Sequence, residues 1–222
     1  MGLPVLVYGK SGSGKSRSLK FFGEDEILLV NIEGKTLPFK NKFKYVIKTD
    51  NTDTIISQAS KMPCKVCVLD DAGYLMTHHF MNNHRNKKGN ASFDMYDDIA
   101  DKMYFLVQDI KNKLPEDVIV YIMLHEDTTD AGETKLRTIG KLIDNKVCME
   151  GMVTICIRCM SDNGKHFFRT QTDGFDITKT PEEMFADVEI ENDLKAVDTA
   201  IREFYGWNEP PKKSKEVKNG KA

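Results

Sequence analysis

The chain has 222 residues, of which 40% are hydrophobic and 30% charged, and its formal net charge is −2. This length suits one large α/β domain, which we expect at 1–206, followed by a disordered, lysine-rich tail at 207–222. No apolar run approaches the roughly 18 residues needed to cross a membrane, so we expect no membrane partner. Because the net charge is slightly negative, binding of nucleic acid would depend on local basic patches.

Five cysteines and a beginning without an export signal predict reduced thiols in a cytoplasm. The pairs Cys64/Cys67 and Cys156/Cys159 have the spacing of a zinc site. Cys67 and Cys156 lie in strand-like runs, however, and residues three apart on a strand point to opposite faces. We therefore interpret these residues as buried, inert cysteines.

The first predicted element is an apolar strand at 5–8, which runs into Gly9-Lys10-Ser11-Gly12-Ser13-Gly14-Lys15-Ser16. This G-x-x-x-x-G-K-S pattern is typical of a phosphate-binding loop between a strand and a helix. The glycines let backbone N–H groups approach phosphate oxygens, and a helix predicted to begin near Gly14 adds its N-terminal N–H groups. Lys15 would contact the β- and γ-phosphates of a nucleoside triphosphate, and the Ser16 hydroxyl would bind Mg²⁺.

Short apolar runs alternate with helical patterns after this loop. Buried strands are predicted at 27–32, 44–47, 65–69 and 118–124, and helices at 52–60 and 93–114. The segment 73–92, rich in His, Asn and Lys, is predicted to be mostly irregular. This alternation predicts an α/β fold with a mostly parallel central sheet flanked by helices, in which the ligand binds at the carboxyl ends of the strands.

The last third of the chain has a different pattern. Apolar segments at 152–160 and 166–171 flank Asn163-Gly164, and an Asn-Gly pair in this setting is a strong signal for a β-hairpin. A final helix is predicted at 192–205. We therefore expect a C-terminal antiparallel hairpin beside the parallel sheet.

Polar residues follow three predicted strands, at the sheet edge that carries the phosphate loop. Asp70 is our candidate Mg²⁺ ligand, and Asp71 competes for that role. Glu33 could orient the water that attacks the γ-phosphate, unless it is a surface residue paired with Lys35. His125 could donate to the γ-phosphate and signal hydrolysis to the loop after it, unless it is an ordinary polar residue at a strand end.

Three motifs in this order resemble the RecA-like ATPase core, an AAA-type ATP-binding domain: Asn31-Ile32-Glu33-Gly34, Val68-Leu69-Asp70-Asp71 and Met123-Leu124-His125-Glu126. More narrowly, residues 150–152, 172–176 and 179–185 resemble phage ATP-binding proteins that include RecA-like single-strand annealing ATPases. The resemblance implies that Glu33 is the catalytic base and that His125 senses the γ-phosphate. Asp71 replaces the Ser or Thr usual in the family, so the division of labour between Asp70 and Asp71 stays open.

The resemblance also implies partners. It predicts a Mg²⁺-dependent ATPase that acts on single-stranded DNA in phage recombination, annealing or replication, in the cytoplasm of an infected bacterium. A homo-oligomeric ring or filament is expected, with Lys179 acting across the subunit boundary and a single-strand-binding protein as a further partner. Two basic segments are candidates for contacting DNA, unless they are solvated charged loops: Arg85, Lys87 and Lys88, with Phe80 nearby to stack on a base, and Lys135 with Arg137.

Other classes share parts of this pattern. A nucleoside or nucleotide kinase has the same loop and a similar sheet, but it needs several cations around the transferred phosphoryl group, and residues 127–140 carry two against three carboxylates, Asp127, Asp130 and Glu133. A GTPase needs an Asn/Thr-Lys-x-Asp guanine reader late in the sheet, and the nearest string, Lys48-Thr49-Asp50, comes too early. An ATP-dependent assembly protein with slow turnover would not require a base such as Glu33.

Overall fold

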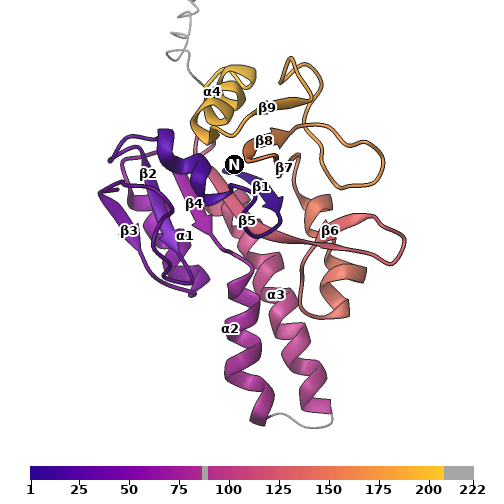
Figure 1. Cartoon of the computed structure of the whole chain (residues 1–222). Helices are drawn as coiled ribbons and strands as arrows, with labels where there is room; N and C mark the ends of the chain where they lie inside the picture. Colours follow the sequence, from indigo (N-terminus) through magenta and orange to yellow (C-terminus); the bar gives the residue numbers. More distant parts are fainter. Residues whose placement is uncertain (87–89, 208–222) are drawn as a thin grey trace, which may run out of the picture.

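The computed structural model describes residues 1–86 and 90–207 and contains one mixed sheet covered by helices (Figure 1). The strands follow the order β3-β2-β4-β5-β1-β7-β8-β9, and β6 pairs with β5. All neighbours from β3 to β7 are parallel, whereas β6, β8 and β9 pair antiparallel. The strands are β1 (Leu3–Gly9), β2 (Ile27–Asn31), β3 (Tyr45–Ile47), β4 (Val66–Asp70), β5 (Ile119–Thr128), β6 (Thr134–Leu136), β7 (Ile155–Asp162), β8 (Lys165–Arg169) and β9 (Glu189–Glu191).

These pairings confirm the predicted α/β class, the mostly parallel sheet and the C-terminal hairpin. The hairpin turns at Asn163 and Gly164, which have φ angles of 46° and 78°. Two successive residues with positive φ are what a type I′ hairpin turn requires, and an Asn-Gly pair adopts them at low cost.

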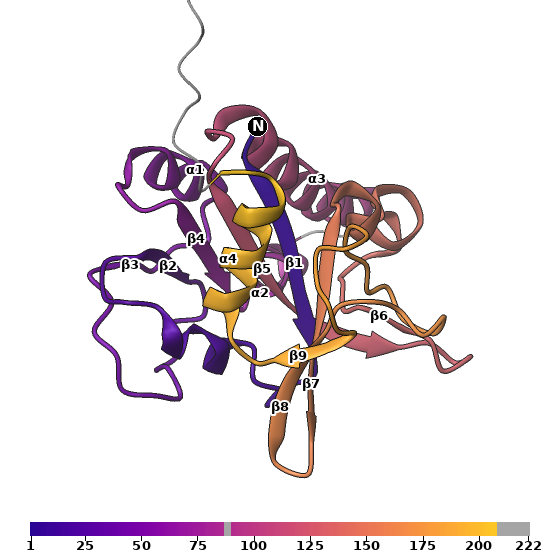
Figure 2. The same cartoon turned by 90° about the horizontal axis from the view of Figure 1, so that it is seen from above.

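Helices cover both faces of the sheet (Figure 2). The helices α1 (Thr52–Lys61), α2 (Tyr74–Asn83) and α3 (Asn90–Lys113) pack on one face, and the 3₁₀ helix η1 (Ser16–Phe21) and α4 (Leu194–Phe204) pack on the other. Because side chains alternate along a strand, β1 contributes Leu6 and Tyr8 to the first layer and Val5 and Val7 to the second. Shorter turns are η2 (His84–Asn86), η3 (Ile143–Val147) and η4 (Met149–Met152).

The segment 73–92, predicted to be irregular, is instead largely helical. It forms α2, η2 and the start of α3, and α2 and α3 make an antiparallel hairpin that extends away from the sheet (Figure 1). Leu75 and Met76 anchor α2, because they are 0% and 1% exposed against the core. The prediction was wrong because this packing outweighs the weak helix propensity of the His and Asn residues around them.

Two other elements differ from their predicted lengths. The helix expected near Gly14 forms only as the six-residue 3₁₀ helix η1, which ends before the extended residue Phe22. Strand β5 does not end near His125 but continues to Thr128, because its last residues pair with β6. The polar segment after His125 is therefore partly a second antiparallel hairpin.

The two cysteine pairs differ. Cys64 precedes β4 and packs, half-buried, against the same core layer as Cys67, so the expectation that this pair points to opposite faces was wrong. The second pair is separated as predicted. Cys156 belongs to the core layer under α3, whereas Cys159 belongs to the opposite layer under α4.

Lys87, Lys88 and residues 208–222 of the predicted tail lie outside the described residues. Trp207, the first residue of that predicted tail, packs against the core layer that contains α4. Within residues 1–86 and 90–207, none of the helices combines the length and the apolar character that crossing a bilayer requires.

Candidate nucleotide-binding site

The phosphate loop leaves β1 at the carboxyl edge of the sheet. Gly12 and Gly14 have φ angles of 79° and 109°, a region that other residues enter only with strain. Gly9 has a different constraint, because a Cβ there would lie 2.2 Å from the carbonyl oxygen of Cys159 on β7. The glycines of the motif therefore serve both the curvature of the loop and its close contact with β7.

Substitution of Gly9 by alanine is expected to destabilise the fold by about 2–3 kcal/mol, because backbone atoms of β7 must move to admit the Cβ. Gly12→Ala is the control: its Cβ meets nothing within 4 Å, so only the positive φ is penalised, at about 1 kcal/mol. Urea unfolding measures both. Equal losses would exclude the tight contact between the loop and β7.

Lys15 and Ser16 are positioned by different partners. The Lys15 side chain is buried, and its Nζ donates to the carbonyl oxygens of Gly9 at 2.8 Å and Lys10 at 3.0 Å. Burial lowers the pKa of the Lys15 ammonium. The Ser16 hydroxyl donates to Asp70 Oδ1 at 2.8 Å. A hydroxyl and a carboxylate oxygen in contact are the ligand types that Mg²⁺ prefers, so this pair fits a magnesium site.

Asp70 and Asp71 separate into distinct environments. Asp70 ends β4 and is 6% exposed, and this burial raises the pKa of its carboxyl group while the Ser16 hydrogen bond opposes the rise. Asp71 turns away through a left-handed conformation, with φ of 57°. Its carboxylate accepts from Lys35 Nζ at 2.6 Å and lies 3.4 Å from His125 Nε2. Hydrogen bonds from His125 and then Lys35 lower the pKa of Asp71 to about 2, so this carboxylate is ionised at neutral pH.

His125 links Asp71 to the lysine of the loop. It lies directly opposite Gly9 in the pairing of β5 with β1, and its Nδ1 is 3.4 Å from Lys15 Nζ. Because an ammonium group can only donate, Nδ1 is the acceptor and the ring hydrogen sits on Nε2, facing Asp71. The result is a chain of polar contacts that connects Lys15, His125, Asp71 and Lys35.

Glu33 follows β2 at the same edge but has a separate partner. Its Oε2 is 3.0 Å from Nε2 of His78 on α2, and Nδ1 of the same ring is 3.2 Å from Asp50 Oδ2. Glu33 is not among the residues that line the cavity at the phosphate loop. In this conformation, a helix of the projecting hairpin therefore holds the predicted base.

The cavity at the loop has a volume of about 300 Å³ and brings in residues that the sequence did not single out. His166 on β8 donates from Nδ1 to the carbonyl oxygen of Ser13 at 2.8 Å, and its ring packs where a Cβ of Gly14 would be. No local pattern signals this residue, because hairpin pairing brings it to the loop. The lining contains Ser11, Gly12, Gly14, Lys15, Ser16, Arg17, Lys35, Pro38, Asp71, His125 and His166.

The candidate DNA-contacting residues lie on two hairpins. Arg85 is exposed in η2 at the far end of α2. Phe80, expected to stack on a base, stacks on His84 and packs against the core in this structure. On the β5–β6 hairpin, Arg137 is exposed and its backbone N–H donates to the carbonyl oxygen of His125 at 2.8 Å.

The other predicted cations are more constrained. Lys135 on β6 forms an ion pair with Asp144 at 3.2 Å. Lys179 is half-buried, and its backbone pairs with Cys156, which lies opposite Leu6 in the middle of the sheet. Lys179 is not part of the cavity lining at the loop of its own chain.

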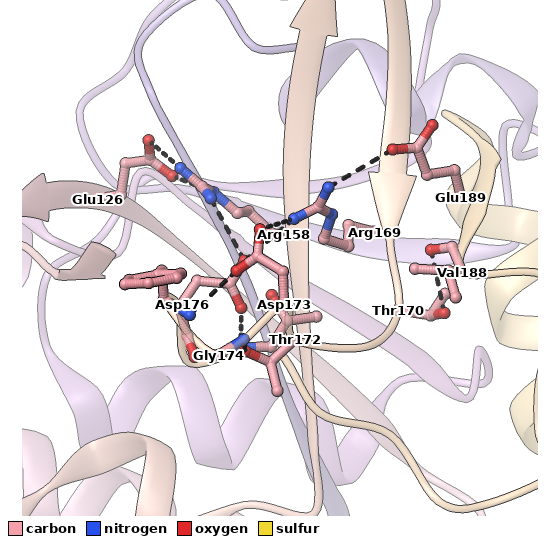
Figure 3. A network of polar contacts seen from close by, with 12 residues as sticks. Glu126, Arg158, Arg169, Thr170, Thr172, Asp173, Gly174, Asp176, Val188 and Glu189 are labelled. Carbon is pink, nitrogen blue, oxygen red and sulfur yellow. Dashed lines mark hydrogen bonds and ion pairs between the residues drawn. The ribbon is translucent and has the colours of Figure 1, made fainter. Parts of the chain in front are cut away.

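A network of ion pairs supports the strand ends beside the loop (Figure 3). Arg158 on β7 donates from Nε and Nη2 to the two carboxylate oxygens of Glu126, at 2.9 and 3.1 Å. Its Nη1 is 3.3 Å from Asp176, whose side chain is fully buried. Such a bidentate ion pair is geometrically specific. Glu126, the residue after His125, is therefore held against β7, and Arg158 links it to the loop 172–176.

Comparisons with known proteins leave the functional question to this geometry. No protein-family model matches the chain, and no curated protein matches it.

Proposed function

We propose that this protein is a RecA-like P-loop ATPase that binds ATP with Mg²⁺, hydrolyses it and acts on single-stranded DNA. The observation that carries the proposal is the 2.8 Å hydrogen bond from Ser16 to Asp70, next to a buried Lys15. A sequence match to the phosphate loop could arise by chance. Contact between the loop serine and a carboxylate 54 residues away supports the match, because the pair offers two oxygen ligands of the kind that Mg²⁺ prefers.

The residues divide the work of hydrolysis in this proposal. Backbone N–H groups of the loop and Lys15 bind the β- and γ-phosphates, and Ser16 and Asp70 hold Mg²⁺. When bound, Mg²⁺ would neutralise charge that develops on the phosphate oxygens. Glu33 orients the attacking water after it separates from His78. His125 donates to the γ-phosphate from Nε2 after this nitrogen separates from Asp71.

Strand order supports a RecA-like arrangement. Strand β5 lies between β1, which carries the loop, and β4, which carries Asp70. This insertion puts His125 between Lys15 and Asp71, within 3.4 Å of each. The γ-phosphate of a nucleotide bound to Lys15 would therefore lie near the imidazole.

A route from the nucleotide to the proposed DNA contacts supports the second half of the proposal. The backbone of Arg137 is bonded to the backbone of His125, and Glu33 is bonded to the α2–α3 hairpin through His78. Hydrolysis that shifts either residue would displace an exposed basic segment. In this proposal, these two hydrogen bonds couple the nucleotide to the DNA contacts, and they supply the two-state element that a nucleotide-controlled DNA-binding protein needs.

Phosphate release from ATP is the direct test, measured with and without Mg²⁺ and with and without single-stranded DNA. We expect hydrolysis that depends on Mg²⁺ and increases with DNA. A kinase would instead transfer the γ-phosphate to an added nucleoside or nucleotide, and it would release no phosphate when this acceptor is absent. That result would contradict the proposal. If the protein hydrolyses ATP but neither binds single-stranded DNA nor is stimulated by it, an ATP-dependent assembly protein becomes the favoured function.

Replacing Arg85, Lys87 and Lys88 together by alanine is expected to weaken binding of single-stranded DNA. Three lost phosphate contacts would reduce the slope of log affinity against log salt by about 2. Fluorescence anisotropy with a labelled oligonucleotide, in the presence of ATP and Mg²⁺, measures this slope.

The control is a matched triple variant in which Lys61, Lys65 and Lys113 are replaced by alanine. These substitutions remove the same charge near the opposite edge of the sheet, where β4 and β5 begin. The salt slope of this control variant is expected to equal that of the wild type. Equal slopes for both triple variants would show that Arg85, Lys87 and Lys88 do not contact DNA.

A further inference from the structure

A second and larger cavity adjoins the phosphate loop. It has a volume of about 670 Å³ and lies between η1 and the strands β8 and β9. Arg17 and His166 line both this cavity and the cavity at the loop, so the two share a wall. At about 300 Å³, the loop cavity is at the lower limit of pockets that enclose small ligands. Most of a nucleotide would therefore lie beyond it.

We infer that the cavity between η1 and β8–β9 binds the adenosine moiety of the triphosphate. This inference rests on the proposed nucleotide-binding function and adds where the nucleoside lies and which residues contact it.

The residues on the two sides of the loop cavity indicate in which direction the triphosphate lies. Lys35, Asp71 and His125 line the side where the γ-phosphate is expected, and Arg17 and His166 line the side shared with the larger cavity. A triphosphate that lies along the loop with its γ-phosphate near His125 points its α-phosphate toward His166. The nucleoside then enters the larger cavity without a sharp turn of the triphosphate.

The lining of the larger cavity suits a planar base with an amino group. Phe21 is 41% exposed and offers a ring on which a base can stack. The Arg17 guanidinium donates from Nη1 to Oδ1 of the buried Asn192 at 3.0 Å, and this hydrogen bond holds the cation beside the cavity. Three carboxylates can accept hydrogen bonds from the exocyclic amino group of adenine: Asp162, Glu189 and Glu191.

Inorganic tripolyphosphate carries the phosphates without a nucleoside. Comparing it with ATP therefore distinguishes binding of the phosphates from binding of the adenosine moiety. We expect the wild type to bind Mg-ATP more tightly than Mg-tripolyphosphate in isothermal titration calorimetry. Phe21→Ala should weaken ATP about 10-fold, the usual loss for one aromatic stacking partner, and leave tripolyphosphate unchanged. The control Phe105→Ala removes an exposed ring from α3, 56% exposed, and should alter neither ligand.

Photolabelling locates the base without a substitution. With 8-azido-ATP and Mg²⁺, the label is expected within residues 17–21, 162–167 or 189–192, and excess ATP should prevent it. Label elsewhere, equal affinity for ATP and tripolyphosphate, or an unchanged ATP affinity in Phe21→Ala would overturn this location and leave the phosphate site intact. Failure of both ATP and tripolyphosphate to bind would reject the proposed function together with this inference.

Discussion

Glu33→Gln is expected to lower the rate of ATP hydrolysis by about 10³-fold while the affinity for Mg-ATP stays within about 3-fold of the wild type. Glutamine keeps the size and one hydrogen-bonding oxygen of the side chain but cannot accept the proton of the attacking water. Glu33 is outside the cavity lining, so its loss should not remove a phosphate contact. Single-turnover phosphate release gives the rate, and calorimetry gives the affinity.

Glu24→Gln is the matched control, because it neutralises an exposed glutamate elsewhere and should hydrolyse ATP normally. Hydrolysis at the wild-type rate by Glu33→Gln would remove Glu33 from the mechanism. In that case, Asp71 is the next candidate, since it lines the cavity and is ionised at neutral pH, and Asp71→Asn would show the loss instead.

Lys15→Ala is expected to weaken Mg-ATP binding by about 100-fold. The ammonium group now donates to two loop carbonyls, and a bound nucleotide would replace or add to these with charge-assisted hydrogen bonds to phosphate, each worth about 1.5–3 kcal/mol. The measurement is calorimetric titration with Mg-ATP. A second readout is thermal unfolding, because a saturating ligand stabilises the native state by about 2.7 kcal/mol at 100 times its Kd.

Lys10→Ala provides the control within the same loop. Its side chain is exposed, and its backbone groups remain after the substitution, so the affinity for ATP should change by less than about 3-fold. Equal weakening by both substitutions would mean that general positive charge, rather than the buried position of Lys15, attracts the nucleotide. Urea unfolding of Lys15→Ala checks that lost affinity does not reflect a lost fold.

Much of the fold could be predicted because its signals are local. The buried strands, the helix α1 and the Asn163-Gly164 turn follow from apolar runs, helical periodicity and a turn signal that a few neighbouring residues carry. The α2 segment could not be predicted, because Leu75 and Met76 become helical through contact with α3 and the sheet. The short η1 helix likewise depends on packing of Leu19 and Phe22 against the layer that contains α4.

For the site, the sequence by itself determined the phosphate loop and the polar residues that follow three strands, since each lies within a short contiguous motif. Only the tertiary structure decided how they are paired: Ser16 with Asp70, His125 with Asp71, and Glu33 with His78. These choices depend on strand order and register, which bring together residues tens of positions apart. The same long-range pairing places His166 against the loop, a contact that no spacing in the sequence records.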